Sequence, residues 1–142
     1  MKRKTLMSVL LVVAVSVVFS TLVSAQEPQC KVNWPQAASS VKFQIDRDTI
    51  EESLLQAAIL DELSDPNLCE SKKAFYKTAL DYLNEVLLHT SAACGYCKAM
   101  QDARSDKTGG MYLLMVLGEL SKASDSFTNA LQYYYEAKMT KC

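Results

Sequence analysis

The sequence predicts an all-α protein, a small helical bundle held together by disulfides. Two long stretches repeat apolar residues at alternating spacings of three and four, which keeps the side chains on one stripe of a helix. The chain has only four glycines and three prolines, too few to supply the turns of an all-β fold. Five cysteines, all beyond residue 25, are expected to join the helices through disulfide bonds.

Residues 1–25 have the features of a cleaved secretory signal peptide. Lys2, Arg3 and Lys4 form a basic start, residues 6–19 are apolar apart from two serines, and small residues lie at Val23-Ser24-Ala25. The alternative is an uncleaved membrane anchor, because the apolar region extended to Val23 approaches the length of a membrane span. We expect a secreted, extracellular protein with one helical domain, residues 26–142.

The charge balance argues against two classes of partner. Loss of the three basic residues near the start leaves 12 basic and 16 acidic residues, a formal charge of −4. A mildly acidic domain without a basic run is unsuited to nucleic acid or to anionic membrane surfaces. No second long apolar stretch follows, so no membrane span is expected after cleavage.

Residues 26–47 lack a clear helical period and are expected to form an extended arm laid over the bundle. Val41, Phe43 and Ile45 alternate as in an extended chain, and Trp34 and Phe43 are its predicted anchors.

The first helix is predicted over residues 48–64. Thr49 and Glu52 have the spacing of a capping box, Asp48 is an alternative cap, and residues 64–67 (Ser-Asp-Pro-Asn) end the helix. Its predicted buried face consists of Ile50, Leu54, Leu55, Ala58, Ile59 and Leu63.

The second helix is predicted over residues 70–105. Its stripe continues without a skip past Gly95, which favours one long helix; a break at Gly95 would give a four-helix bundle instead. The stripe comprises Tyr76, Ala79, Leu83, Val86, Thr90, Ala93, Cys97 and Met100.

The third helix is predicted over residues 110–140, after a tight connection at residues 106–110. Such a connection makes the last two helices antiparallel neighbours in a coiled-coil-like pair. The stripe comprises Leu113, Val116, Leu120, Ala123, Phe127, Ala130, Tyr134 and Ala137.

The helical hairpin restricts how the cysteines can pair. Cys69 and Cys94 lie about 35 Å apart if one helix joins them, too far for a disulfide. In the hairpin, Cys142 returns beside Cys69, so a Cys69–Cys142 disulfide is expected. Cys30 is then left to pair with Cys94 or Cys97. The unpaired fifth cysteine is either a buried thiol or the link of a disulfide-bonded dimer.

No residue pattern indicates an enzyme, a metal site or a cofactor. Cys94-Gly95-Tyr96-Cys97 has redox spacing, but it falls late in a helix rather than at a helix start within a βαβ unit. His89 is the only histidine in the chain, and with Cys94 and Cys97 it would give three ligands where structural zinc requires four.

The predicted function is that of a secreted, non-enzymatic interaction protein, either a cytokine-like ligand or an extracellular effector that binds another protein. Exposed tyrosine and methionine side chains favour such contacts, so Tyr112, Met115, Tyr133 and Tyr135 are the candidate interface. The alternative is a carrier that holds a small apolar molecule between its helices. The predicted lining of that cavity is Leu83, Leu87, Met100, Leu120 and Phe127.

Overall fold

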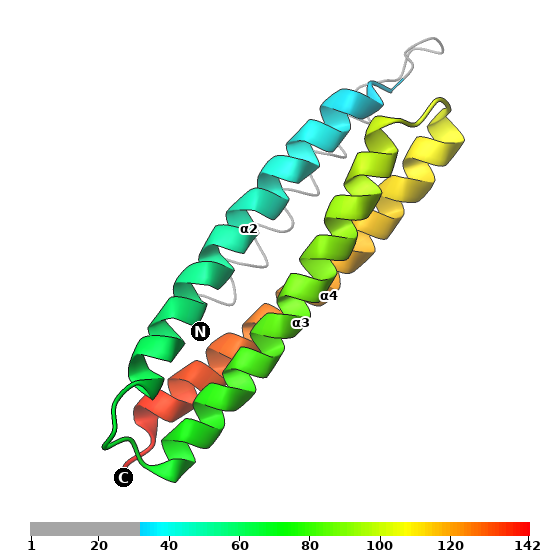
Figure 1. Ribbon diagram of the computed structural model, residues 1–142. Helices are drawn as coiled ribbons and strands as arrows, with labels where there is room; N and C mark the ends of the chain where they lie inside the picture. The colour runs from blue at the N-terminus through cyan, green and yellow to red at the C-terminus, as the bar shows by residue number, and fades with distance from the viewer. Residues whose placement is uncertain (1–31) are drawn as a thin grey trace.

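A computed structural model describes residues 32–142 and shows a bundle of three long helices (Figure 1). These are α2 (Trp34–Leu63), α3 (Glu70–Gln101) and α4 (Asp106–Met139). The predicted all-α, three-helix bundle is confirmed. The predicted signal peptide, residues 26–31 of the predicted arm, and therefore Cys30, lie outside the described residues.

Helices α3 and α4 form an antiparallel hairpin that contains most of the contacts between helices. All eight predicted stripe positions of α3 are buried. On α4, seven of the eight are buried and Tyr134 is half-buried. Helix α3 is continuous through Gly95, where an added Cβ would meet nothing within 4 Å. The four-helix alternative is therefore wrong.

The connection between α3 and α4 is displaced by a few residues from the prediction. Helix α3 ends at Gln101, and α4 begins at Asp106 because the Ser105 hydroxyl accepts a hydrogen bond from the Thr108 backbone N–H. That bond is an N-terminal cap. Gly109 and Gly110, predicted to lie in or beside the turn, both lie within the first turns of α4.

Helix α2 begins fourteen residues earlier than predicted, so the extended arm is wrong for residues 34–47. Asn33 caps the helix by accepting a hydrogen bond from the Gln36 backbone N–H, and Pro35 occupies the first turn. Proline is tolerated there because the first N–H groups of a helix have no internal partner. Thr49 does not cap a helix: its hydroxyl donates to the Ile45 carbonyl within α2.

The Trp34 side chain, predicted to anchor an extended arm, instead anchors the start of helix α2. Its indole is buried against Gly109, and Nε1 donates to Asp106 Oδ1 at 3.1 Å. Phe43, the other predicted anchor, is 73% exposed because it lies on the side of α2 away from the hairpin. The first turn of α2 is therefore fixed to the first turn of α4.

The core forms two clusters, separated along the bundle. The first lies toward the α3–α4 connection, and its buried members are Trp34, Ala38, Val41, Ile45, Ala93, Cys97, Met100, Leu113, Val116 and Leu120. The second lies toward the disulfide, and its buried members are Leu55, Ile59, Tyr76, Ala79, Leu83, Val86, Ala123, Phe127, Ala130 and Ala137.

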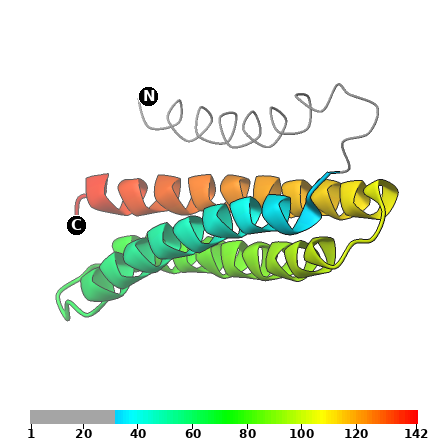
Figure 2. The same ribbon diagram turned by 90° about the horizontal axis from the view of Figure 1, so that it is seen from above.

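Helix α2 packs mainly along α3 and has few contacts with α4 (Figure 2). At its last turn, Glu62 accepts hydrogen bonds from the Tyr76 hydroxyl, at 3.2 Å, and from Lys138 Nζ. These bonds hold the pKa of Glu62 below its usual value, chiefly through the bond with Lys138. Hydrogen bonds between side chains therefore connect α2 to α4 at both ends of α2.

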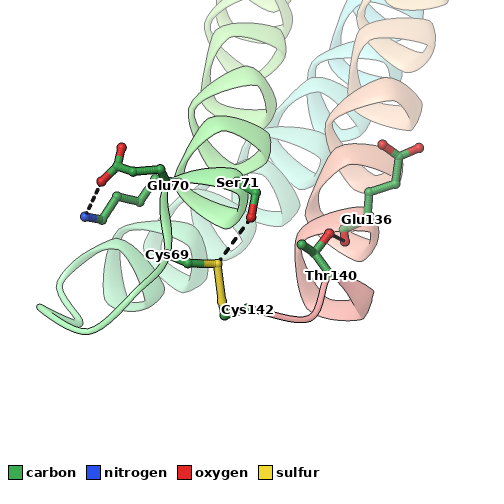
Figure 3. Close-up of a disulfide and its surroundings, with 7 residues drawn as sticks. Cys69, Glu70, Ser71, Glu136, Thr140 and Cys142 are labelled. Atoms are coloured by element: carbon green, nitrogen blue, oxygen red, sulfur yellow. Dashed lines mark hydrogen bonds and ion pairs between the residues drawn. A yellow bond between two sulfur atoms is a disulfide. The ribbon is translucent and has the colours of Figure 1, made fainter.

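A Cys69–Cys142 disulfide closes the far end of the hairpin (Figure 3). The two Cα atoms lie 5.8 Å apart, and the bond joins the residue before α3 to the C-terminal residue. The pairing predicted from the antiparallel hairpin is present in the structure. Because the two cysteines lie 73 positions apart in the sequence, the bond restricts a large part of the unfolded chain.

Candidate functional site

Three large apolar side chains project from the outer face of α2. Phe43, Ile50 and Leu54 are 73%, 61% and 68% exposed, and their spacings of seven and four place them on one stripe of the helix. We call these three residues the outer stripe. The buried residues of α2, among them Val41 and Ile45, occupy its opposite face. Ile50 and Leu54 were predicted to be buried, and that prediction is wrong.

The outer stripe is a candidate surface for binding a helix or an apolar patch of another protein. Scattered single apolar residues are normal on a protein surface, whereas a large contiguous apolar patch marks an interaction site. Charged groups flank the line: Lys42 pairs with Asp46 at 2.6 Å, and Glu51 is exposed. An apolar line with charged edges is the usual face of a helix that docks against a partner.

Two of the predicted interface residues serve the packing of the bundle. The Tyr133 ring stacks on Tyr82, with centroids 5.6 Å apart, and also contacts Phe75 at 6.3 Å. Tyr112 is half-buried against the first core cluster. Both rings pack along the hairpin of α3 and α4.

The other two predicted interface residues are exposed. Met115 lies near the start of α4 beside exposed Met111 and Leu114. Tyr135 is exposed near the end of α4, and its ring meets Tyr134 edge-on at 5.5 Å. They lie on separate parts of α4, so the four predicted residues do not form one surface.

The middle of α2 carries two carboxylates on the face of the helix that packs against the rest of the bundle, where the other residues are apolar. Asp48 and Glu52 fall between Ile45 and Leu55, which belong to the two different core clusters. Glu52 is only 5% exposed, and its Oε2 has no hydrogen-bond partner within the described structure. Burial raises the pKa of Glu52 because it disfavours the charged form.

The carboxylate of Asp48 has polar and charged partners, whereas that of Glu52 has none in the described structure. Its Oδ1 accepts a hydrogen bond from Gln44 at 2.6 Å and lies 3.6 Å from the Arg47 guanidinium. Burial raises the pKa of Asp48, and Arg47 and Gln44 partly oppose that rise. Arg47 Nε is itself buried without a hydrogen-bond partner. Sequence reasoning missed this polar segment because it assigned Thr49 and Glu52 to a helix cap.

Cys94 and Cys97 both carry free thiols in the structure. Cys97 is buried and donates a hydrogen bond from Sγ to the Ala38 carbonyl at 3.1 Å, which joins α3 to α2. Burial raises the pKa of the Cys97 thiol, so its reactive thiolate form is disfavoured. Cys94 is exposed. The predicted bridge from Cys30 to one of them involves a residue outside the described part of the chain.

His89 forms an ion-pair network on the hairpin. Its Nδ1 lies 2.7 Å from Glu119 Oε2, and Lys122 Nζ lies 2.8 Å from Glu119 Oε1. The hydrogen bonds from Lys122 and His89 lower the pKa of Glu119. One turn away, Ser126 donates to Glu85 at 3.0 Å. The His89–Glu119 and Ser126–Glu85 bonds join α3 to α4.

The predicted lining of a ligand cavity is divided between the two core clusters. Met100 and Leu120 belong to the first cluster, and Leu83 and Phe127 belong to the second. Leu87 is exposed on α3. The structure therefore uses four of the five as packed core residues.

Within residues 32–142, no helix is long and apolar enough to cross a membrane. No group of three or more His, Cys, Asp or Glu side chains in this part of the chain could hold a metal ion.

Comparison of the chain with protein-family models, with curated proteins and with solved structures found no match.

Proposed function

We propose that this chain is a secreted, non-enzymatic interaction protein that binds another extracellular protein through the outer stripe of α2. The observation that carries the proposal is the alignment of Phe43, Ile50 and Leu54 on one exposed face. Water in contact with this line is released when an apolar surface covers it, which supplies the driving force for association.

The position of the stripe supports this proposal. The inner face of α2 is already occupied by the core, so the outer face can accept a partner without unfolding the bundle. Lys42, Asp46 and Glu51 line its edges and would favour partners of complementary charge. The signal peptide predicted for residues 1–25 supports an extracellular partner.

Site-specific photocrosslinking tests this proposal. A photoreactive phenylalanine derivative is placed at Phe43, or at Gln56 as the control, which is exposed on α2 outside the stripe. Each protein is incubated with the extracellular fluid of the source tissue and irradiated. The Phe43 probe should capture one protein, and excess unlabelled chain should prevent the capture. Equal products from both probes would reject the outer stripe as the binding surface.

The alternative prediction, a carrier of a small apolar ligand, would require the helices to separate, because Met100 and Phe127 are packed in different core clusters and Leu87 is exposed. A fluorescent fatty acid that is displaced from delipidated protein by apolar ligands would support it. No binding up to high micromolar concentration would remove it.

A further inference from the structure

The side of α3 that faces away from the core is exposed along most of its length. The eight buried positions of α3 are spaced by three and four residues, and the residues one or two positions after each of them lie on the opposite side of the helix. That opposite line runs from Lys77 to Asp102 with the same alternating spacings, and every residue on it is exposed. We call this line the back stripe of α3.

The centre of the back stripe is uncharged and combines one large apolar residue with smaller ones. It consists of Asn84, Leu88, Ser91 and Gly95. Leu88 is 67% exposed, and a Cβ added to Gly95 would meet nothing within 4 Å. Residues 86–97 include no Lys, Arg, Asp or Glu. The centres of protein interfaces are depleted of charge in the same way.

Each end of the back stripe carries one basic and one acidic residue. Lys77 and Asp81 lie before the centre, and Lys98 and Asp102 lie after it. None of these four side chains forms an ion pair or a side-chain hydrogen bond within the described part of the chain. Because the basic residue comes first at both ends, a reversed copy of the line sets an acidic group opposite each basic one.

We propose that the back stripe is the contact surface of a reversible homodimer, in which the α3 helices of two copies pack antiparallel about a two-fold axis. The axis passes between residues 89 and 90, so that Leu88 faces Ser91 of the second copy and Asn84 faces Gly95 of the second copy. Each of these pairs sets a larger side chain against a smaller one, which allows two helices to pack closely. The surface is complementary to itself, as a two-fold dimer requires.

The same register joins opposite charges at both ends of the contact. Asp81 faces Lys98 of the second copy, and Lys77 faces Asp102 of the second copy. The two-fold axis repeats each of these ion pairs, so charged pairs lie on both sides of the uncharged centre. Exposed ion pairs contribute little affinity each, but they determine which surfaces associate and in which register.

Other ways of pairing the two helices lack this complementarity. A shift by one heptad in one direction sets Leu88 against Lys98, and a shift in the other direction sets Asp102 against Glu70. Parallel pairing in register sets each charged residue against its own copy. Like charges in contact oppose association, so the antiparallel register is favoured over these alternatives.

The dimer requires no disulfide. In this register the two copies of Cys94 lie about 14 Å apart along the helices, beyond the reach of a disulfide. The back stripe contains no cysteine, so a bridge from Cys30 to Cys94 or Cys97 leaves its side chains in place. The outer stripe lies on a different helix and is not part of the contact, so the dimer does not depend on the function proposed for α2.

Sedimentation equilibrium of the protein recovered from the medium of a secreting host tests the dimer. The native chain should associate reversibly and weakly, because each copy contributes a single large apolar side chain to the stripe. Higher ionic strength should weaken the association by screening the ion pairs. A denaturing gel without reducing agent should show single chains. A chain that stays monomeric up to about 1 mM, or a dimer held by a disulfide, would overturn the proposal.

Charge reversal tests the register. Asp81→Lys alone and Lys98→Asp alone should each weaken dimerisation about tenfold, since each sets like charges opposite one another. An equal mixture of these two variants should form a mixed dimer about as stable as the native one, because positions 81 and 98 then carry opposite charges again. The double variant should also recover. A mixture that associates no better than the separate variants would refute the antiparallel contact.

A charge placed at the centre of the back stripe tests the contact itself. Leu88→Asp should weaken dimerisation at least tenfold, because it puts like charges into the centre of the interface. Leu114→Asp is the matched control, since Leu114 is 70% exposed on α4, outside the back stripe. Circular dichroism should show unchanged helix content in both variants because both side chains are exposed. Equal dimerisation of the two variants would exclude the back stripe as the contact surface.

Discussion

At the scale of single residues, the contact between Trp34 and Gly109 fixes the start of the bundle. A Cβ built on Gly109 would lie 2.1 Å from an indole carbon of Trp34. Glycine is required here because the ring occupies the space of a side chain. The sequence predicted a buried Trp34, but it placed Gly109 in a turn because glycine more often marks chain reversals than close approaches of a ring.

Gly109→Ala should destabilise the protein by about 1–3 kcal/mol, because the indole must move from its packed position. Gly118→Ala is the matched control: it lies in the same helix, and an added Cβ meets nothing within 4 Å. It should stabilise the protein by about 0.5–1 kcal/mol, since alanine favours a helix more than glycine does. Urea unfolding measures both; a loss of stability in both variants would contradict the role of the Trp34 contact.

Glu52→Leu should raise the free energy of unfolding near pH 7 by about 1–3 kcal/mol, because it removes a buried carboxyl group without a partner. This increase in the free energy of unfolding should become smaller as the pH falls, because Glu52 of the unmutated protein then becomes neutral. Denaturant unfolding at several pH values measures the difference. A variant less stable than the native protein at neutral pH would show that Glu52 has a partner there.

At the scale of helices, the sequence predicted α3 and α4 well and the start of α2 poorly. The stripes of α3 and α4 run for eight positions without an interruption, so the helical period is unambiguous. In α2 the seam is interrupted by Asp48 and Glu52, and Val41, Phe43 and Ile45 also fit an alternating pattern. The prediction therefore divided one helix into an arm and a short helix. The Asn33 cap and Pro35 were the signals that could have located its true start.

Asn33→Ala should therefore destabilise the protein by about 1 kcal/mol, the usual effect of losing an N-terminal cap. Thr49→Ala should change stability by less than about 0.5 kcal/mol, because Thr49 lies inside α2 and bonds only to the Ile45 carbonyl. Thermal unfolding followed by circular dichroism compares the two. A larger loss from Thr49→Ala would mean that the helix begins near residue 49.

At the scale of the whole molecule, the bundle combines a disulfide-closed hairpin with a third helix that has one face in the core and one face exposed. The sequence predicted the hairpin and the Cys69–Cys142 bond because both follow from the register of two long stripes. It could not predict the outer stripe, because assigning Ile50 and Leu54 to an exposed face requires knowing where α2 begins.

Cys142→Ser should lower the free energy of unfolding by about 2–4 kcal/mol, through loss of the constraint on the unfolded chain. Cys94→Ser, which removes an exposed thiol, should leave that constraint intact and is the control. Peptide mapping without reduction should recover Cys69 linked to Cys142. The same map would show whether Cys30 is linked to Cys94 or Cys97; a Cys142 linked to either of these two would contradict the hairpin.

The affinity for the captured extracellular partner is the most direct test of the proposed role of the outer stripe. The triple variant Phe43→Ser, Ile50→Ser, Leu54→Ser should bind at least tenfold more weakly than the native chain, because a few residues at the centre of an interface contribute most of the binding energy. The matched control is Leu88→Ser, which removes an exposed leucine from α3 and should bind as the native chain does. Equal affinity of the triple variant and the native chain, measured by titration calorimetry, would contradict binding through the outer stripe.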